Sequence, residues 1–126
     1  MGTIVRLTCA QCGYTETLEL GAGLQAIYPE KLIPLFPQER IKNFRQVLSC
    51  GQLAYFQFEQ KPGYCDHCRQ WQATPTLTYR QQGNIARKVQ GDCRACHQAV
   101  KLAENGPLAC PLCQAQLTQE TIGLWD

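Results

Sequence analysis

Short β-branched and alternating runs, rather than long apolar stripes, dominate the hydrophobic pattern of this 126-residue chain. The runs predict strands over residues 3–8, 14–20, 53–59, 71–80, 85–89, 97–102, 115–117 and 121–125. Pro75 falls inside one of these strands and predicts an edge position or a bulge there. Turn-forming residues over 61–63, 81–84 and 104–107 separate the runs. The pattern therefore favours a small β-rich chain.

One stretch, residues 38–50, has helical periodicity. Ile41, Phe44 and Leu48 recur at the spacing of one helix face, and Gly51 suits the position just after a helix. The opposite face carries Arg40, Lys42 and Arg45, which we interpret as a solvated surface. Prolines before this stretch limit residues 28–38 to turns or one short helix.

Eight of the nine cysteines form four Cys-x-x-Cys pairs. The pairs are Cys9 and Cys12, Cys65 and Cys68, Cys93 and Cys96, and Cys110 and Cys113. Each pair can supply two thiolates to a tetrahedral ion, so the sequence predicts two structural four-cysteine sites holding Zn²⁺, two ions per chain. Iron is the alternative, because thiolate tetrahedra accept both metals. The recurring order of strand, cysteine turn and strand is the plan of a zinc ribbon.

Loop lengths give a first hypothesis about which pairs share an ion. The third and fourth pairs are separated by 13 residues, so we expect them to form one site, which leaves the first and second pairs for the other. The alternative joins the second pair to the third and the first to the fourth. On the favoured pairing, residues 1–84 form a split zinc ribbon with a helical insertion at about 28–50, and residues 85–126 form a C-terminal zinc ribbon, together one compact α+β unit.

Charge and hydropathy bear on whether the chain binds nucleic acid, spans a membrane or is secreted. The formal net charge is +2, from 12 basic and 10 acidic residues, which does not by itself indicate a nucleic-acid-binding protein. No apolar run reaches the length that spans a bilayer, and the first residues lack the pattern of a secretory signal. We therefore expect a cytoplasmic protein, in which paired cysteines are metal ligands rather than disulfides.

Cys50, His67 and His97 lie outside the predicted sets of four ligands. Cys50 has no partner in sequence, and we expect it to be buried behind the helix. His67 and His97 lie within or directly after cysteine pairs and could replace a thiolate, but each site already has four cysteines.

Two redox roles of Cys-x-x-Cys pairs conflict with this sequence. Residues 93–97 match the Cys-x-x-Cys-His pattern of c-type haem attachment, but Met1 is the sole methionine, the three other pairs are alike, and that attachment takes place outside the cytosol. No pair opens a predicted helix, which argues against a thioredoxin-like thiol pair.

The pair at residues 110–113 resembles the second cysteine turn of rubredoxins, which would imply an iron electron carrier, although Gln114 stands where rubredoxins usually have glycine. The whole chain resembles small, largely uncharacterised bacterial zinc-ribbon proteins, through the segments 1–2, 9–14, 21–23 and 123–126 and the later cysteine pairs. That resemblance implies two metal sites and carries no activity. A likeness to nickel-inserting hydrogenase maturation proteins fails, because Gly2 replaces their metal-binding histidine.

No constellation of catalytic residues is recognisable, and two complete four-cysteine sites leave no open coordination position. We therefore expect a non-enzymatic adaptor or accessory protein that presents a surface to a macromolecule, most simply a protein. Two alternatives remain, an iron electron carrier and a nucleic-acid-binding ribbon. For the second, the candidate contacts are Arg69, Trp71, Arg80, Arg87, Lys88 and Arg94.

Overall fold

The computed structural model describes residues 2–103 and 106–126, and it is β-rich with two short α-helices. The strands are β1 Gly2–Thr8, β2 Thr15–Gly21, β3 Leu53–Cys65, β4 Gln70–Gln81, β5 Arg87–Gln90, β6 Lys101–Leu102 and β7 Thr118–Trp125. Between β2 and β3 lie α1 Pro29–Leu32 and α2 Gln38–Ser49, with 3₁₀ turns at Leu24–Ile27 and Ile33–Leu35. The prediction of a small β-rich chain stapled by cysteine clusters is confirmed.

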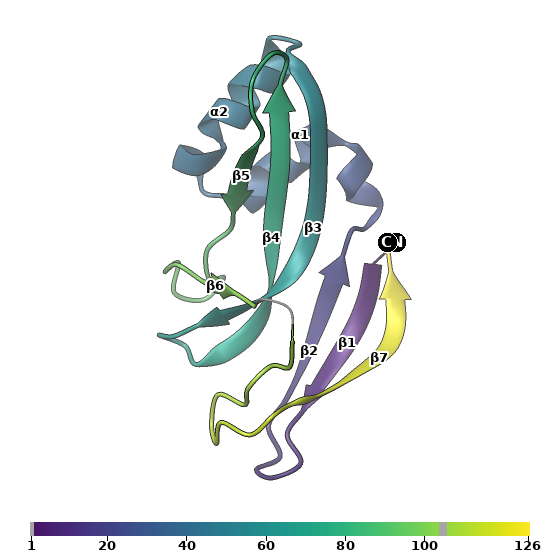
Figure 1. Ribbon diagram of the computed structural model, residues 1–126, viewed down its shortest axis with the longest axis vertical. Helices are drawn as coiled ribbons and strands as arrows, with labels where there is room; N and C mark the ends of the chain where they lie inside the picture. The colour runs from purple at the N-terminus through teal and green to yellow at the C-terminus, as the bar shows by residue number, and fades with distance from the viewer. Residues whose placement is uncertain (1, 104–105) are drawn as a thin grey trace.

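All seven strands belong to one antiparallel sheet in the order β5-β4-β3-β2-β1-β7, with β6 paired to β3. β2 and β3 are joined at a single residue pair, Gly21 with Gln60, so the sheet divides into an upper part, β5-β4-β3, and a lower part, β2-β1-β7 (Figure 1). Because β1 pairs with β7 from Gly2–Trp125 onward, the two described ends of the chain lie side by side.

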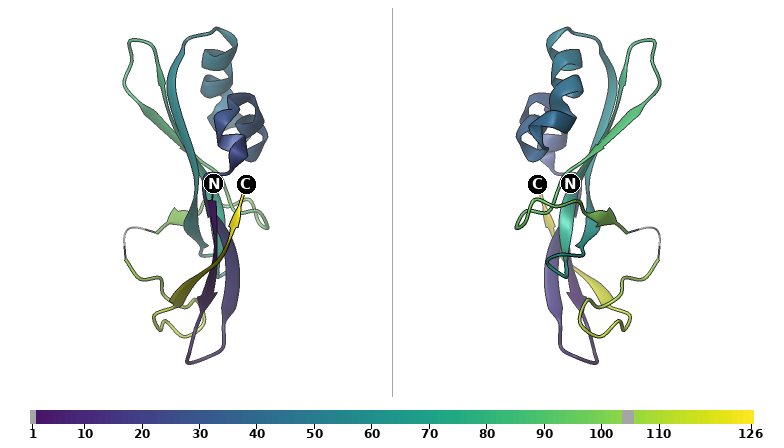
Figure 2. Two further views of the ribbon diagram at one scale, coloured as in Figure 1. Left: turned by 90° about the vertical axis from the view of Figure 1, so that its right-hand side faces the viewer. Right: turned by 90° about the vertical axis from the view of Figure 1, so that its left-hand side faces the viewer.

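The upper part of the sheet is covered on one face by α2 (Figure 2). The helix buries Ile41, Phe44 and Val47, which confirms its predicted position and apolar face; Leu48 is only half-buried. Phe44 meets the Tyr79 ring edge-on, with centroids 5.1 Å apart, a favourable arrangement of two aromatic quadrupoles. The upper core therefore comes from residues at helical spacing on α2 facing residues at strand spacing on β3 and β4.

A second core fills the lower part of the molecule. It consists of Val5, Leu7, Cys9, Leu18, Trp71, Leu108, Cys110 and Leu117. Trp71 comes from β4, so its indole packs the upper hairpin against the lower strands, and its Nε1–H donates to the Ala109 carbonyl at 2.8 Å. This side chain links the two parts of the sheet where their backbones have separated.

Two prolines lie inside long strands. Pro62 lies in β3 opposite Ala73, so the turn predicted over residues 61–63 is wrong. Proline fits there because the extended backbone of a strand tolerates its fixed φ. Pro75 is in the central strand β4, not at an edge, and no register shift occurs there. Its carbonyl accepts from the N–H of Gly91, just beyond the end of β5. The N–H that proline lacks would point to the same side, beyond the last β4–β5 pair, Thr76 with Gln90, so the ladder within β5 loses no hydrogen bond.

The remaining predicted strands are shorter or displaced. Of residues 97–102 only Lys101–Leu102 is a strand, and 85–89 becomes Arg87–Gln90. The stretches predicted at 115–117 and 121–125 become one isolated bridge, Ala109 with Gln116, followed by the single strand β7. The turn predicted over 104–107 falls partly on residues 104–105, which lie outside the described residues.

Candidate metal centres

The four Cys-x-x-Cys turns share one backbone conformation. In each turn, the residue after the second cysteine has a positive φ, and its N–H donates to the carbonyl of the first cysteine. These residues are Gly13 (80°, 3.1 Å), Arg69 (52°, 2.8 Å), His97 (62°, 2.9 Å) and Gln114 (69°, 2.9 Å). Glycine adopts a positive φ without steric cost and occupies this position in one turn; the other three turns hold a larger residue there at a steric cost. The turn geometry therefore depends on the cysteines and their hydrogen bonds rather than on glycine.

The structure brings the eight cysteines into two groups of four. The terminal cluster is Cys9, Cys12, Cys110 and Cys113, and the central cluster is Cys65, Cys68, Cys93 and Cys96. Within each cluster all four sulfur atoms lie within 4.8 Å of one another. The favoured sequence pairing, first turn with second and third with fourth, is therefore wrong, and the alternative is observed. Each cluster takes cysteines from both sides of residue 84, the boundary expected between two ribbons.

Strand pairing explains why loop length misled the sequence interpretation. The turn at Cys9 and Cys12 joins β1 to β2, and β7, which follows Cys113, pairs with β1, so the first and last turns meet at one end of the lower sheet (Figure 1). The turn at Cys65 and Cys68 closes the β3–β4 hairpin, twelve paired positions long, beside the turn that follows β5. Closing a longer loop costs only about 0.6 kcal/mol per doubling of its length, which such ladders outweigh.

Both clusters fit a tetrahedral ion. The sulfur pairs Cys9–Cys113 and Cys12–Cys110 are each separated by 3.4 Å. The pairs Cys65–Cys96 and Cys68–Cys93 are separated by 3.5 and 3.8 Å. A zinc tetrahedron with bonds of about 2.3 Å has sulfur atoms about 3.8 Å apart. The two sites could therefore each hold a metal ion, with four thiolates and no position supplied by another residue type.

The central cluster has a side-chain hydrogen-bond donor beside it. Gln72 on β4 is 8% exposed, and its Nε2–H donates to Cys93 Sγ at 3.2 Å while its Oε1 accepts from the N–H of Arg94 at 3.1 Å. Burial raises the pKa of Cys93, but the Gln72 donor and the backbone N–H of Cys96 overcome it and lower that pKa to about 6. Gln72 thus favours the thiolate that a metal requires. Its sequence neighbours, Trp71 and Ala73, gave no sign of this role.

The terminal cluster relies on backbone donors. The backbone N–H of Cys12 is the main cause that lowers the pKa of Cys9 to about 6. For Cys12, the backbone N–H of Tyr14 acts to lower the pKa, yet the neighbouring Cys110 sulfur and burial raise it to about 12. Cys12 and Cys113 are exposed, whereas the second cysteines of the central cluster are half-buried. The terminal cluster is therefore the more solvent-accessible of the two.

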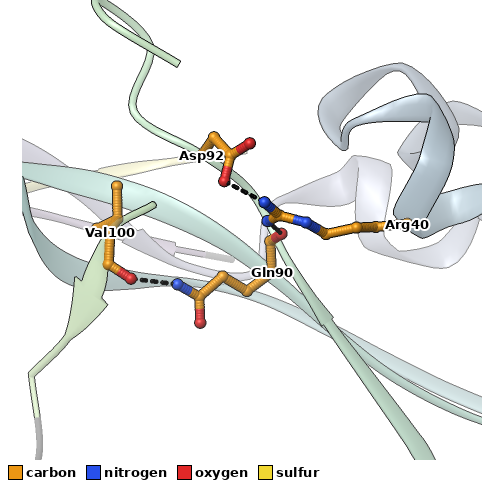
Figure 3. Close-up of polar contacts among 4 residues, drawn as sticks. All are labelled: Arg40, Gln90, Asp92 and Val100. Atoms are coloured by element: carbon orange, nitrogen blue, oxygen red, sulfur yellow. Dashed lines mark hydrogen bonds and ion pairs between the residues drawn. The ribbon is translucent and has the colours of Figure 1, made fainter. Parts of the chain in front are cut away.

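Contacts from α2 and β5 hold the segments on either side of the third cysteine turn (Figure 3). Arg40 on α2 pairs with Asp92 at 2.7 Å and donates to the Gln90 carbonyl at 3.0 Å, and the side chain of Gln90 donates to the Val100 carbonyl. Arg40 was predicted to lie on the solvated face of α2, but it instead holds the segment that leads into Cys93. Lys42 and Arg45 on that face are exposed.

Several predicted site residues lie outside the clusters. Cys50, expected in the core, is exposed at the end of α2, because the buried face of the helix turns away before it. His67 and His97 are exposed and belong to neither cluster; His67 Nδ1 lies 3.9 Å from Cys68 Sγ. The role of Trp71 in base stacking is contradicted, since the side chain is 9% exposed within the lower core.

The five basic candidates for nucleic-acid contact are exposed but do not share one patch. Arg69 directly follows the second cysteine turn and Arg94 lies within the third, both near the lower end of β4. The other three, Arg80, Arg87 and Lys88, lie near its upper end. Arg69 and Arg80 are separated by nearly the full length of this strand, about 35 Å at 3.3 Å per residue. The five residues therefore do not form one compact basic patch.

We expect exchange of Gln72 for glutamate to weaken metal binding at the central cluster. The carboxylate keeps the size of the side chain but replaces the N–H donor to Cys93 with a negative charge, and such changes typically cost about 10–100-fold in metal affinity. Competition between the protein and a chromogenic chelator measures the affinity of each site. Gln81→Glu on the same strand is the control, and equal affinities for the two variants would contradict the assignment.

The chain has no match among protein-family models, curated proteins or solved structures. Within the described residues, no helix is long and apolar enough to cross a membrane.

Proposed function

We propose that this chain is a non-enzymatic accessory module whose two four-cysteine sites hold structural Zn²⁺ ions in zinc-ribbon-like turns, and which presents a surface to a macromolecular partner. The observation that carries the proposal is that each cluster supplies four thiolates to one point. A zinc ion with four protein ligands has no open position for water or substrate, so it stabilises rather than catalyses.

The positions of the clusters support a structural role. The terminal cluster joins the β1–β2 turn to the chain beside β7, and the central cluster joins the β3–β4 turn to the segment after β5. Each ion would therefore cross-link segments distant in the sequence. The two hydrophobic cores are small, and a bound ion adds about 10 kcal/mol or more of apparent binding free energy to the folded state in peptide models.

The test is the metal content and visible spectrum of the protein purified without added metal. We expect two zinc ions per chain and a colourless solution, because zinc has a filled d shell. A red protein with iron in both sites would contradict the structural-zinc assignment and favour the electron carrier. About one metal per chain would contradict the assignment of two closed sites.

A further inference from the structure

The connection between β4 and β5 forms an exposed hairpin at one end of the upper sheet. The hairpin arm, residues 80–88, lies on the side of the upper sheet away from α2 (Figure 2). β4 stays paired with β3 as far as Gln81, and the N–H of Gln82 donates to the Gln52 carbonyl at 3.0 Å, so the unpaired part of the arm is the loop from Gly83 to Ala86. Every residue from Gln82 to Lys88 is exposed, and Ile85 in its loop is 86% exposed. An isoleucine this exposed at the end of a hairpin contributes little to the core. The arm is therefore available to contact something outside the chain.

The arm is basic, and its charges are free. Arg80, Arg87 and Lys88 lie on it, and no acidic residue occurs between Asp66 and Asp92. Among the described residues, none of these three side chains forms an ion pair, whereas Arg40, Lys61 and Lys101 each pair with a carboxylate. Uncompensated cations on an exposed element favour an anionic partner.

The charge of the arm continues into the part of the molecule that carries it. Residues 38–60 and 74–91, which include α2 and most of the upper sheet, contain six basic and two acidic residues, so their net charge is +4. The rest of the chain has six basic and eight acidic residues, a net charge of −2. The near-neutral total therefore hides a positive end, which would steer a polyanion toward the arm.

The strand register places polar and aromatic groups beside these cations. Tyr55, 46% exposed, lies opposite Arg80 in the β3–β4 ladder, and Lys88 lies opposite Thr78 in the β4–β5 ladder. Both pairs are on the face turned away from α2, because the neighbouring pair Phe56 and Tyr79 packs toward the helix core. Hydroxyl groups and cations on one strand ribbon are groups that contact phosphates.

We propose that the hairpin arm binds duplex DNA, entering its major groove with Ile85 toward the base edges and the three basic residues toward the phosphates. The inference rests on the proposed function, since it names the partner of that module. The major groove admits a two-stranded β-ribbon, and an apolar side chain can contact thymine methyl groups there.

The test measures binding of a short fluorescein-labelled DNA duplex by fluorescence anisotropy across a range of salt concentrations. Three phosphate contacts predict that the logarithm of the association constant falls with the logarithm of salt with a slope of about −3. Replacing Arg87 and Lys88 with alanine should reduce the magnitude of this slope by about 2. Ile85→Ser should weaken binding about tenfold and leave the slope unchanged, because it removes a base contact and no charge.

The control replaces Lys42 and Arg45 on α2 with alanine, which removes the same charge from the same end of the molecule but not from the arm. It should leave the slope unchanged; an equal loss would show that only the overall field acts, and would overturn the proposal. Displacement of the duplex by poly-glutamate at equal charge would also overturn it, in favour of an acidic protein partner.

Metal content separates failure of this inference from failure of the proposed function. No DNA binding at low salt by protein that holds two zinc ions would overturn the role of the arm alone. Loss of the expected zinc content would contradict the proposed function whether or not the duplex binds.

Discussion

Replacing Cys9 and Cys110 together with serine should remove one metal ion from the protein and leave the other bound. Both residues belong to the terminal cluster, so the double variant damages one site only. The pairing favoured from loop lengths would place them in different sites and would predict loss of both ions. Elemental analysis of the purified variant distinguishes these outcomes directly, and two lost ions would contradict the structure.

The same variant should lose stability in the lower part of the molecule. A site with two thiolates holds zinc far more weakly than one with four, and the loss approaches the free energy of a structural site, about 10 kcal/mol. Hydrogen exchange should accelerate in β1, β2 and β7, while β4 and α2 stay protected by the upper core. Cys50→Ser is the matched control and should retain both ions, because Cys50 is exposed and belongs to neither cluster.

The local patterns of the sequence predicted the elements well, and the reason is physical. Helical spacing of Ile41 and Phe44 identified α2 within one residue, and β-branched runs identified β1 and β2 within one residue at each end. Cysteine spacing identified the eight members of the clusters, because a turn of fixed geometry needs its two sulfur atoms three residues apart.

The pairing of the cysteine turns depended on long-range strand register, which a single sequence does not encode locally. β7 returns to pair with β1 and carries the fourth turn to the first. Loop entropy varies too slowly with length to override such a ladder. Similarly, the positive φ of Arg69, His97 and Gln114 could not be anticipated, since these residues do not favour that conformation on their own.

Trp71 was misread for a related reason. Its place in the sequence among the basic residues from Arg69 to Arg94 led to the prediction of an exposed face available for base stacking. The fold instead covers that face with the lower strands and the segment around Ala109, so the aromatic ring becomes the contact between the two parts of the sheet. Gln72, the next residue, is buried on the opposite face of β4, where its side chain donates a hydrogen bond to Cys93 Sγ.

Trp71→Ala should therefore destabilise the protein rather than alter its contacts with a partner. Removing a buried tryptophan typically costs about 3–5 kcal/mol, since it leaves a cavity in the core. Here it also removes the hydrogen bond to the carbonyl of Ala109, directly before Cys110, and the contact with the Tyr64 ring, 5.3 Å between centroids. Urea unfolding at a fixed free-zinc concentration, followed by circular dichroism, measures the loss.

The conservative variant Trp71→Phe separates packing from hydrogen bonding. It keeps most of the ring volume and leaves the Ala109 carbonyl without its donor, so we expect a smaller loss of about 1–2 kcal/mol. The alanine variant should also bind zinc more weakly at the terminal cluster than at the central one, because the cavity adjoins Cys110 in the lower core. Unchanged stability in the alanine variant, together with weaker nucleic-acid binding, would instead restore the stacking role that the buried position of Trp71 argues against.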